Sequence, residues 1–177
     1  MSDLVRNAVR FVLFILVQYY VLFQIRPLHE FVVPYIYYLY VLWLPFTMGR
    51  MTLMLVSFLF GLTLDYFTQT PGLHAAACVM IAYLRAFVVN ILIPQEGAEL
   101  NYKSPSPVSM GWAPYAVYVL VLTLVHHIYL VLLEWLQFGS FLFFLGKVLA
   151  TTGISLMLVL ITELLFFRKE KFRTNTA

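Results

Sequence analysis

Six apolar runs, separated by short polar breaks, occupy almost all of the 177 residues. A helix needs ~20 apolar residues to cross a hydrocarbon core of about 30 Å. Four of the runs approach or exceed that length, and we predict a membrane-spanning helix for each of them: 8–25, 73–93, 113–135 and 141–167. The pattern therefore predicts an all-α integral membrane protein.

The second and third runs, 31–46 and 51–64, are short for full spans. The second run also holds Pro34 and Pro45. Two readings fit these runs: short tilted helices, or a re-entrant pair buried by neighbouring helices. We favour the first reading, which predicts one membrane domain over residues 1–167, a bundle of six transmembrane helices with short loops.

Composition agrees with a membrane solvent. The chain is 63% hydrophobic and 11% charged, with a mean hydropathy of +0.90. A soluble domain of this length has too little interior to hide that much apolar surface. The basic tail, 168–177, fits an anionic lipid surface better than nucleic acid, so we expect the lipid bilayer as a partner and no nucleic acid.

Charge sets the expected orientation, because cytoplasmic segments of membrane proteins are rich in Lys and Arg. With both termini in the cytoplasm, eight Lys and Arg residues fall inside and two fall outside. The inner set is Arg6, Arg10, Arg50, Lys103, Arg168, Lys169, Lys171 and Arg173, and the outer set is Arg26 and Lys147. This bias predicts an even number of spans. The longest polar segment, 94–112, is then cytoplasmic, and we interpret it as a linker, with a docking loop as the alternative.

Asp65 closes the third apolar run. A carboxylate at a helix C-terminus opposes the helix dipole, so local helix stability does not explain it. Two interpretations remain: a surface residue at the outer interface, or a polar anchor that fixes the turn into the next helix or meets a partner.

Four further polar residues fall inside the apolar runs and are expected to be buried: Arg85, His126, His127 and Glu134. Arg85 without a partner would cost roughly 2.5–3.5 kcal/mol on insertion scales. It is expected to extend to the cytoplasmic interface, or to pair with Glu163. For the histidines, hydrogen bonding between helices is the default. A metal site lacks ligand spacing, and no nucleophile–base pair or phosphate-binding loop stands out, so the chain is expected to be non-enzymatic, without cofactor or metal.

Small residues recur at helical spacing in two runs: Cys78, Ala82 and Ala86 in the fourth, and Gly146, Ala150 and Gly153 in the sixth. Such stripes allow close approach of helices. Packing inside the bundle is the favoured interpretation, and a face for another protein's transmembrane helix is the alternative.

One motif resembles a known family. Gly61-Leu62-x-x-Asp65, followed by Pro71-Gly72-Leu73-x-Ala75, resembles the rod shape-determining protein MreD family. The likeness in hydropathy and length covers nearly the whole chain, and the motif covers residues 61–75.

The resemblance implies a non-enzymatic subunit of the bacterial cell-elongation machinery in the cytoplasmic (inner) membrane. Such proteins are thought to bind MreC, a single-span scaffold, and through it to couple the MreB filament to peptidoglycan synthesis by RodA and its transpeptidase. The motif residues would then form a partner-binding or structural turn. The family fold is similar to the substrate-binding subunits of energy-coupling-factor vitamin transporters, which supplies the alternative function. In that alternative, Asp65, His74, His126 and His127 would be the polar groups of a vitamin pocket.

Overall fold

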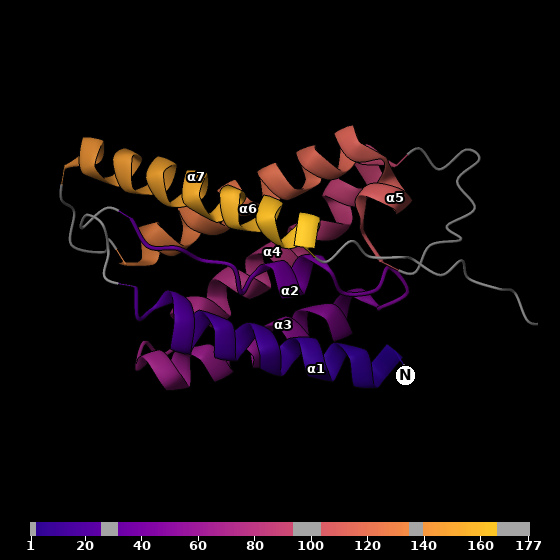
Figure 1. Ribbon diagram of the computed structural model, residues 1–177, viewed down its shortest axis with the longest axis horizontal. Coiled ribbons are helices and arrows are strands. Elements are labelled where there is room, and N and C mark those ends of the chain that lie inside the picture. Colours follow the sequence, from indigo (N-terminus) through magenta and orange to yellow (C-terminus); the bar gives the residue numbers. More distant parts are fainter. Residues whose placement is uncertain (1–2, 26–31, 94–103, 135–139, 166–177) are drawn as a thin grey trace, which may run out of the picture.

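The computed structural model describes residues 3–25, 32–93, 104–134 and 140–165. These residues are helical apart from turns and one extended stretch, and they contain no β-strand. Five long helical stretches make up the bundle (Figure 1): α1 (Asp3–Leu16) continued by the π-helix η1 (Val17–Leu22), α3 (Arg50–Thr68), α4 (Leu73–Leu92), α6 (Trp112–Glu134) and α7 (Phe141–Leu165). Two short helices complete the description: α2 (Leu39–Leu42) and α5 (Pro107–Met110).

The bundle is apolar outside and partly polar inside. Large apolar side chains are exposed on its surface, among them Leu4, Ile91 and Leu142, each more than three-quarters exposed. Polar side chains are buried instead, and Gln18 and His126 are both 0% exposed. This is the reverse of a soluble domain, in which a buried polar group is the exception. Within the described ranges, five helical stretches are long and apolar enough to cross a membrane, which indicates a multi-pass membrane protein.

The second apolar run is not a spanning helix, and the prediction of six such helices is wrong on this point for the described residues. Residues 32–46, here called the central segment, are extended as far as residue 36 and then form turns around the four-residue α2. Pro34 lacks a backbone N–H and biases the residue before it towards extended conformations, and Pro45 lies just after the helical part. The run therefore cannot sustain a long helix.

The central segment nevertheless runs the length of the bundle, antiparallel to α1 (Figure 1). Gln18 of η1 bonds Pro34 at one end, the ring of Phe11 packs on Tyr40 in the middle, and Arg10 lies over the ring of Trp43 at the other end. Every residue from 35 to 44 is at most 6% exposed. Non-helical backbone at membrane depth is tolerated only where protein buries it, and here side chains from all five long helical stretches contact the central segment.

The third run is longer than expected. It was predicted to end at residue 64, but α3 extends to Thr68 and has 19 residues, enough to span. Asp65 therefore lies inside the helix, where its charge would be costly unless another element supplied hydrogen bonds. The start of α4 supplies them, as described below.

The segment 94–112 is described only from residue 104 onward, and residues 94–103 lie outside the described part. Ser106 caps α5 by accepting a hydrogen bond from the backbone N–H of Ser109, and Ser109 returns a bond to the N–H of Ser106. Ser104 and Ser106 are buried, so this part of the expected linker packs on the bundle. The predicted basic tail, 168–177, lies outside the described residues.

Candidate functional site

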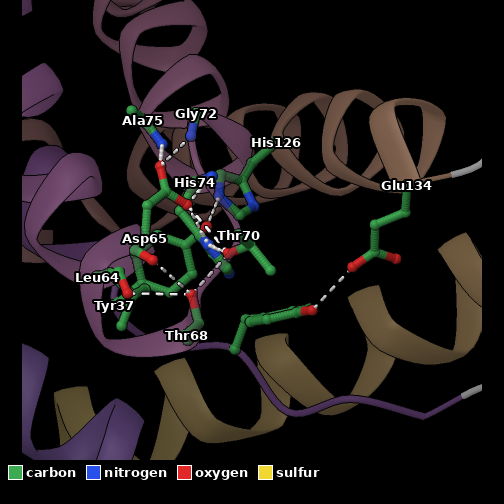
Figure 2. A network of polar contacts seen from close by, with 11 residues as sticks. Tyr37, Leu64, Asp65, Thr68, Thr70, Gly72, His74, Ala75, His126 and Glu134 are labelled. Carbon is green, nitrogen blue, oxygen red and sulfur yellow. Dashed lines mark hydrogen bonds and ion pairs between the residues drawn. The ribbon is translucent and has the colours of Figure 1, made fainter.

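The hairpin between α3 and α4 is organised by the carboxylate of Asp65 (Figure 2). One oxygen, Oδ1, accepts hydrogen bonds from the backbone N–H and the ring Nδ1 of His74, both at 2.8 Å. The other, Oδ2, accepts from the backbone N–H of Gly72 at 3.1 Å and of Ala75 at 3.0 Å. The hydroxyl of Thr70 lies 3.3 Å from Oδ1. Asp65 is 2% exposed, so it has the geometry of the polar anchor rather than of a surface residue.

This geometry explains a carboxylate at the end of α3. The first N–H groups of a helix have no partner within the helix and carry a partial positive charge. Asp65 caps the start of α4, whose dipole favours a negative charge there, and this offsets its unfavourable place in α3. The connection is tight enough to need Gly72 at φ +87° and Gln69 at φ 57°, both in the left-handed region.

Gly61 sets the distance between the two helices. A Cβ at this position would lie 2.5 Å from Cα of Ala75 and 2.7 Å from the carbonyl oxygen of His74. These are backbone atoms, so only a glycine permits the present approach. Of the other motif residues, Leu62 is 42% exposed, Pro71 and Gly72 are exposed, and Leu73 is half-buried. The hairpin itself is thus explained by Gly61, Asp65, Gly72 and Ala75.

Histidine and tyrosine rings gather beside this hairpin. His74 and His126 each pack edge-on against the ring of Tyr37, with centroids 5.3 Å apart in both cases. The hydroxyl of Tyr37 lies 2.8 Å from Nε2 of His126, and the ring of Tyr38 stacks on His126 at 4.7 Å. The central segment, α4 and α6 therefore meet at one aromatic cluster, which sequence spacing did not reveal.

His127 belongs to a separate hydrogen-bond chain. Its Nδ1 lies 2.7 Å from the carbonyl oxygen of Thr123, so Nδ1 carries the proton. Its Nε2 then accepts from the hydroxyl of Ser155 at 3.1 Å. Ser155 Oγ in turn accepts from the backbone N–H of Tyr35 at 3.2 Å.

The Ser155–His127 contact is a hydroxyl–imidazole pair that the spacing of the two residues did not suggest. A serine beside a histidine is also the arrangement of an activated nucleophile. Here both side chains are 0% exposed, and the serine oxygen is engaged by the central segment. In this geometry, Ser155, held by His127, supplies a hydrogen-bond acceptor for the buried backbone N–H of Tyr35.

Gln18 supports the same segment from the other side. Its Nε2 donates to the carbonyl of Pro34 at 3.0 Å, and its Oε1 accepts from the backbone N–H of Ile36 at 2.9 Å and of Tyr37 at 3.3 Å. The amide of Gln18 therefore pairs with three backbone groups of the central segment, as an adjacent β-strand would. The π-helix η1 holds Gln18, and π-helical turns commonly mark functional positions. Sequence reasoning missed this role; the proline-flanked, tyrosine-rich run opposite a buried amide was the available signal.

We expect Gln18→Leu to lower the thermal unfolding midpoint of the detergent-purified protein sharply. It leaves three backbone groups of the central segment without partners, at about 1–3 kcal/mol each. Gln24→Leu is the matched control, because Gln24 is exposed on the same stretch. Circular dichroism follows the transition. Equal midpoints for the two variants would contradict the role assigned to Gln18.

Arg85 is buried inside the bundle and does not extend to its surface. It is 3% exposed, and its guanidinium donates to the carbonyl oxygens of Val41, at 3.3 Å, and Leu44. These carbonyls belong to the end of α2 and the turn that follows, where a helix leaves its last C=O groups unpaired. The fold tolerates the buried guanidinium because backbone carbonyl oxygens inside the bundle accept its hydrogen bonds.

Glu134 differs from the expectation of a buried polar residue. It lies at the exposed end of α6, where Lys147 of α7 pairs with it at 2.5 Å. The hydroxyl of Tyr35 also lies 3.5 Å from its Oε1. Among the residues that the structure describes, no group of three or more His, Cys, Asp and Glu side chains is placed to hold a metal ion.

The two small-residue stripes lie in different surroundings. On α4, Cys78 and Ala82 are 0% exposed and face the core, while Ala86 is half-buried. On α7, Gly146 and Ala150 are half-buried and Gly153 is exposed. A Cβ at Gly153 would meet no atom within 4 Å.

Open grooves mark the apolar outer surface of the described residues. One, of about 540 Å³, runs along α4 and is lined by Met54, Phe58, Gly72, Ala75, Ala76, Val79, Met80, Tyr83 and Tyr129. Two others lie along α1. One is lined by aliphatic residues of α1 and η1, and the other lies between α1 and residues of the central segment and α3, including Tyr40, Leu44 and Val56. Asp65 and the three buried histidines line none of these grooves.

The anchored hairpin, the aromatic cluster and the side-chain supports of the central segment are therefore the features from which function has to be argued. Comparisons with protein-family models, with curated proteins and with solved structures find no match to this chain.

Proposed function

We propose that the chain is a non-enzymatic subunit of the bacterial cell-elongation machinery that binds the transmembrane helix of an MreC-like single-span partner. The observation that carries the proposal is that some residues of the motif build the hairpin while another is exposed on the surface. Gly61, Asp65 and Ala75 build the α3–α4 hairpin, whereas Leu62 is exposed. A motif that only stabilised the hairpin would not need a particular residue at that exposed position.

The partner's contact surface in this proposal is the outer face of α3, which is defined by Leu55, Leu59, Leu62 and Tyr66. Their spacing of four, three and four residues places them on one side of the helix. Exposure of these side chains runs from 42% to 75%. The rigid hairpin behind them holds this face in a fixed shape.

The cell-elongation role also implies an orientation. Arg10 lies over Trp43, and Arg50 lies over Phe87, close to the C-terminal end of α4. We propose that this end of the bundle faces the cytoplasm, which leaves the Asp65–Gly72 turn on the periplasmic side, with the protein in the inner membrane. RodA, its transpeptidase and MreB would be reached directly or through the MreC-like partner.

Co-purification tests the contact surface. We expect the double substitution of Leu62→Ala and Tyr66→Ala to lower recovery of the single-span partner at least tenfold at equal expression. The matched control is Leu160→Ala with Leu164→Ala on α7, two leucines that are 57% and 66% exposed and also four residues apart. Unchanged recovery with the α3 variant would overturn the assignment of this face.

Conditional depletion in the source bacterium tests the role itself. Rounding and lysis in both rich and vitamin-free media are expected for an elongation subunit. Normal shape in rich medium, with arrest only when one vitamin is scarce, would favour the vitamin-transporter alternative instead. No separate observation favours that alternative, because the grooves described above are lined by other residues than its proposed polar contacts.

A further inference from the structure

A pair of buried histidine nitrogens, one on α4 and one on α6, points to a bound ligand. Nε2 of His74 and Nδ1 of His126 have no hydrogen-bond partner within the described part of the chain. The two residues are 3% and 0% exposed. A buried polar atom without a partner costs about 1–3 kcal/mol, and such atoms in native proteins are nearly always bonded to protein or ordered water.

The protonation of His74 follows from its other nitrogen. Nδ1 lies 2.8 Å from Oδ1 of Asp65. That carboxylate also accepts the backbone N–H groups of Gly72, His74 and Ala75, so it acts as an ionised acceptor. Nδ1 of His74 therefore carries the proton, and Nε2 presents a lone pair.

The protonation of His126 follows in the same way. Its Nε2 lies 2.8 Å from the hydroxyl oxygen of Tyr37. Among the described residues this nitrogen is the hydrogen-bond partner of the Tyr37 hydroxyl. If Nε2 were the donor, the buried hydroxyl proton would have no acceptor, so we assign the hydroxyl as the donor. Nε2 then accepts, and Nδ1 carries a proton with nothing to receive it.

One unpaired acceptor and one unpaired donor therefore lie beside the same Tyr37 ring, on which both imidazoles pack edge-on. A direct bond between the two nitrogens would have satisfied both. We propose that one water molecule binds between them, donating to Nε2 of His74 and accepting from Nδ1–H of His126. Water is the smallest molecule that offers both functions, and buried waters commonly bridge polar groups of this kind.

The bound water completes a continuous chain from Asp65 through His74, the water and His126 to Tyr37. Its ends belong to the α3–α4 hairpin and the central segment, which Arg85 of α4 also joins through the carbonyl oxygens of Val41 and Leu44. The chain therefore couples the geometry of the hairpin turn to the buried backbone beside it. This role is independent of the proposed elongation function, since it concerns the interior alone.

Nuclear magnetic resonance of the wild-type chain, labelled with ¹⁵N-histidine in lipid nanodiscs, tests the proposal. We expect magnetisation transfer from water to the Nδ1–H proton of His126. His127 is the internal control, because its Nδ1–H bonds Thr123 and its Nε2 bonds Ser155. No transfer should reach its ring proton. Absence of transfer at His126, protonation of that ring at Nε2, or a direct coupling to Nε2 of His74 would each overturn the proposal.

Substitutions give a second, independent measurement. Either His74→Phe or His126→Phe removes one partner of the water, so the double variant should lose less thermal stability than the two single losses added together. The control pair, His74→Phe with Leu160→Ala, should be additive, because Leu160 is 57% exposed on α7. Additive losses in the first pair would overturn the proposal and indicate that no ligand links the two histidines. One metal ion per chain that disappears in His126→Phe would overturn it in favour of a metal site.

Discussion

Asp65→Ala is expected to lower the free energy of unfolding by about 3–5 kcal/mol. The alanine leaves the backbone N–H groups of Gly72, His74 and Ala75 without their acceptor. It also leaves Nδ1 of His74 unpaired. Since each buried donor costs about 1–3 kcal/mol when unsatisfied, the sum is large even if the turn relaxes.

Denaturant titration of the detergent-purified protein, followed by circular dichroism, measures this loss. Asp65→Asn keeps one acceptor oxygen and should fall between the wild type and Asp65→Ala. Glu134→Ala is the control for removal of a carboxylate as such, because Glu134 is an exposed residue whose ion pair with Lys147 is worth about 0–1 kcal/mol. If Asp65→Ala were no more harmful than Glu134→Ala, the anchor interpretation would be wrong.

Gly61→Ala is the second large expected effect, with a loss of about 3 kcal/mol from overpacking. The added methyl would lie 2.5 Å from Cα and 2.7 Å from the backbone nitrogen of Ala75. Backbone atoms cannot rotate away, so α3 and α4 must separate. That movement also lengthens the hydrogen bonds between Asp65 and the start of α4.

Gly153→Ala is the matched control, because its new methyl meets no atom within 4 Å and alanine favours a helix over glycine by about 1 kcal/mol. Thermal unfolding should therefore move in opposite directions for the two variants. Ala75→Gly should not rescue Gly61→Ala, since the clash involves backbone rather than the alanine methyl. Full rescue, or a Gly61→Ala protein as stable as the wild type, would contradict the close-approach argument.

These two expectations bear on the elongation proposal. Loss of partner binding in Asp65→Ala would follow from a damaged hairpin, so it would not identify a contact. The exposed pair Leu62 and Tyr66 separates the cases, because neither residue bonds across the turn into α4. Stable folding with lost binding in that variant would identify a contact surface.

The solvent of this fold can be inferred from the amino-acid sequence alone. Its length, composition and run lengths require lipid around most of the chain, and four of the long helices follow from runs that approach or exceed a membrane span. The sequence also gives a polar anchor as one interpretation of Asp65, because a carboxylate at the end of a helix is not explained by the stability of that helix. These inferences depend on properties summed over many neighbouring residues, which a single sequence contains.

The conformation of the second run and the pairing of the buried polar groups depend on tertiary contacts. Whether residues 32–46 form a helix depends on Gln18, Arg85 and Ser155, which supply hydrogen bonds from up to 120 positions away along the chain. Without these partners an extended backbone in lipid would be too costly, and the run would have to be helical or leave the membrane. Hydropathy reports how apolar a residue is but not which distant side chain pairs with its backbone, and that pairing is a property of the packed bundle.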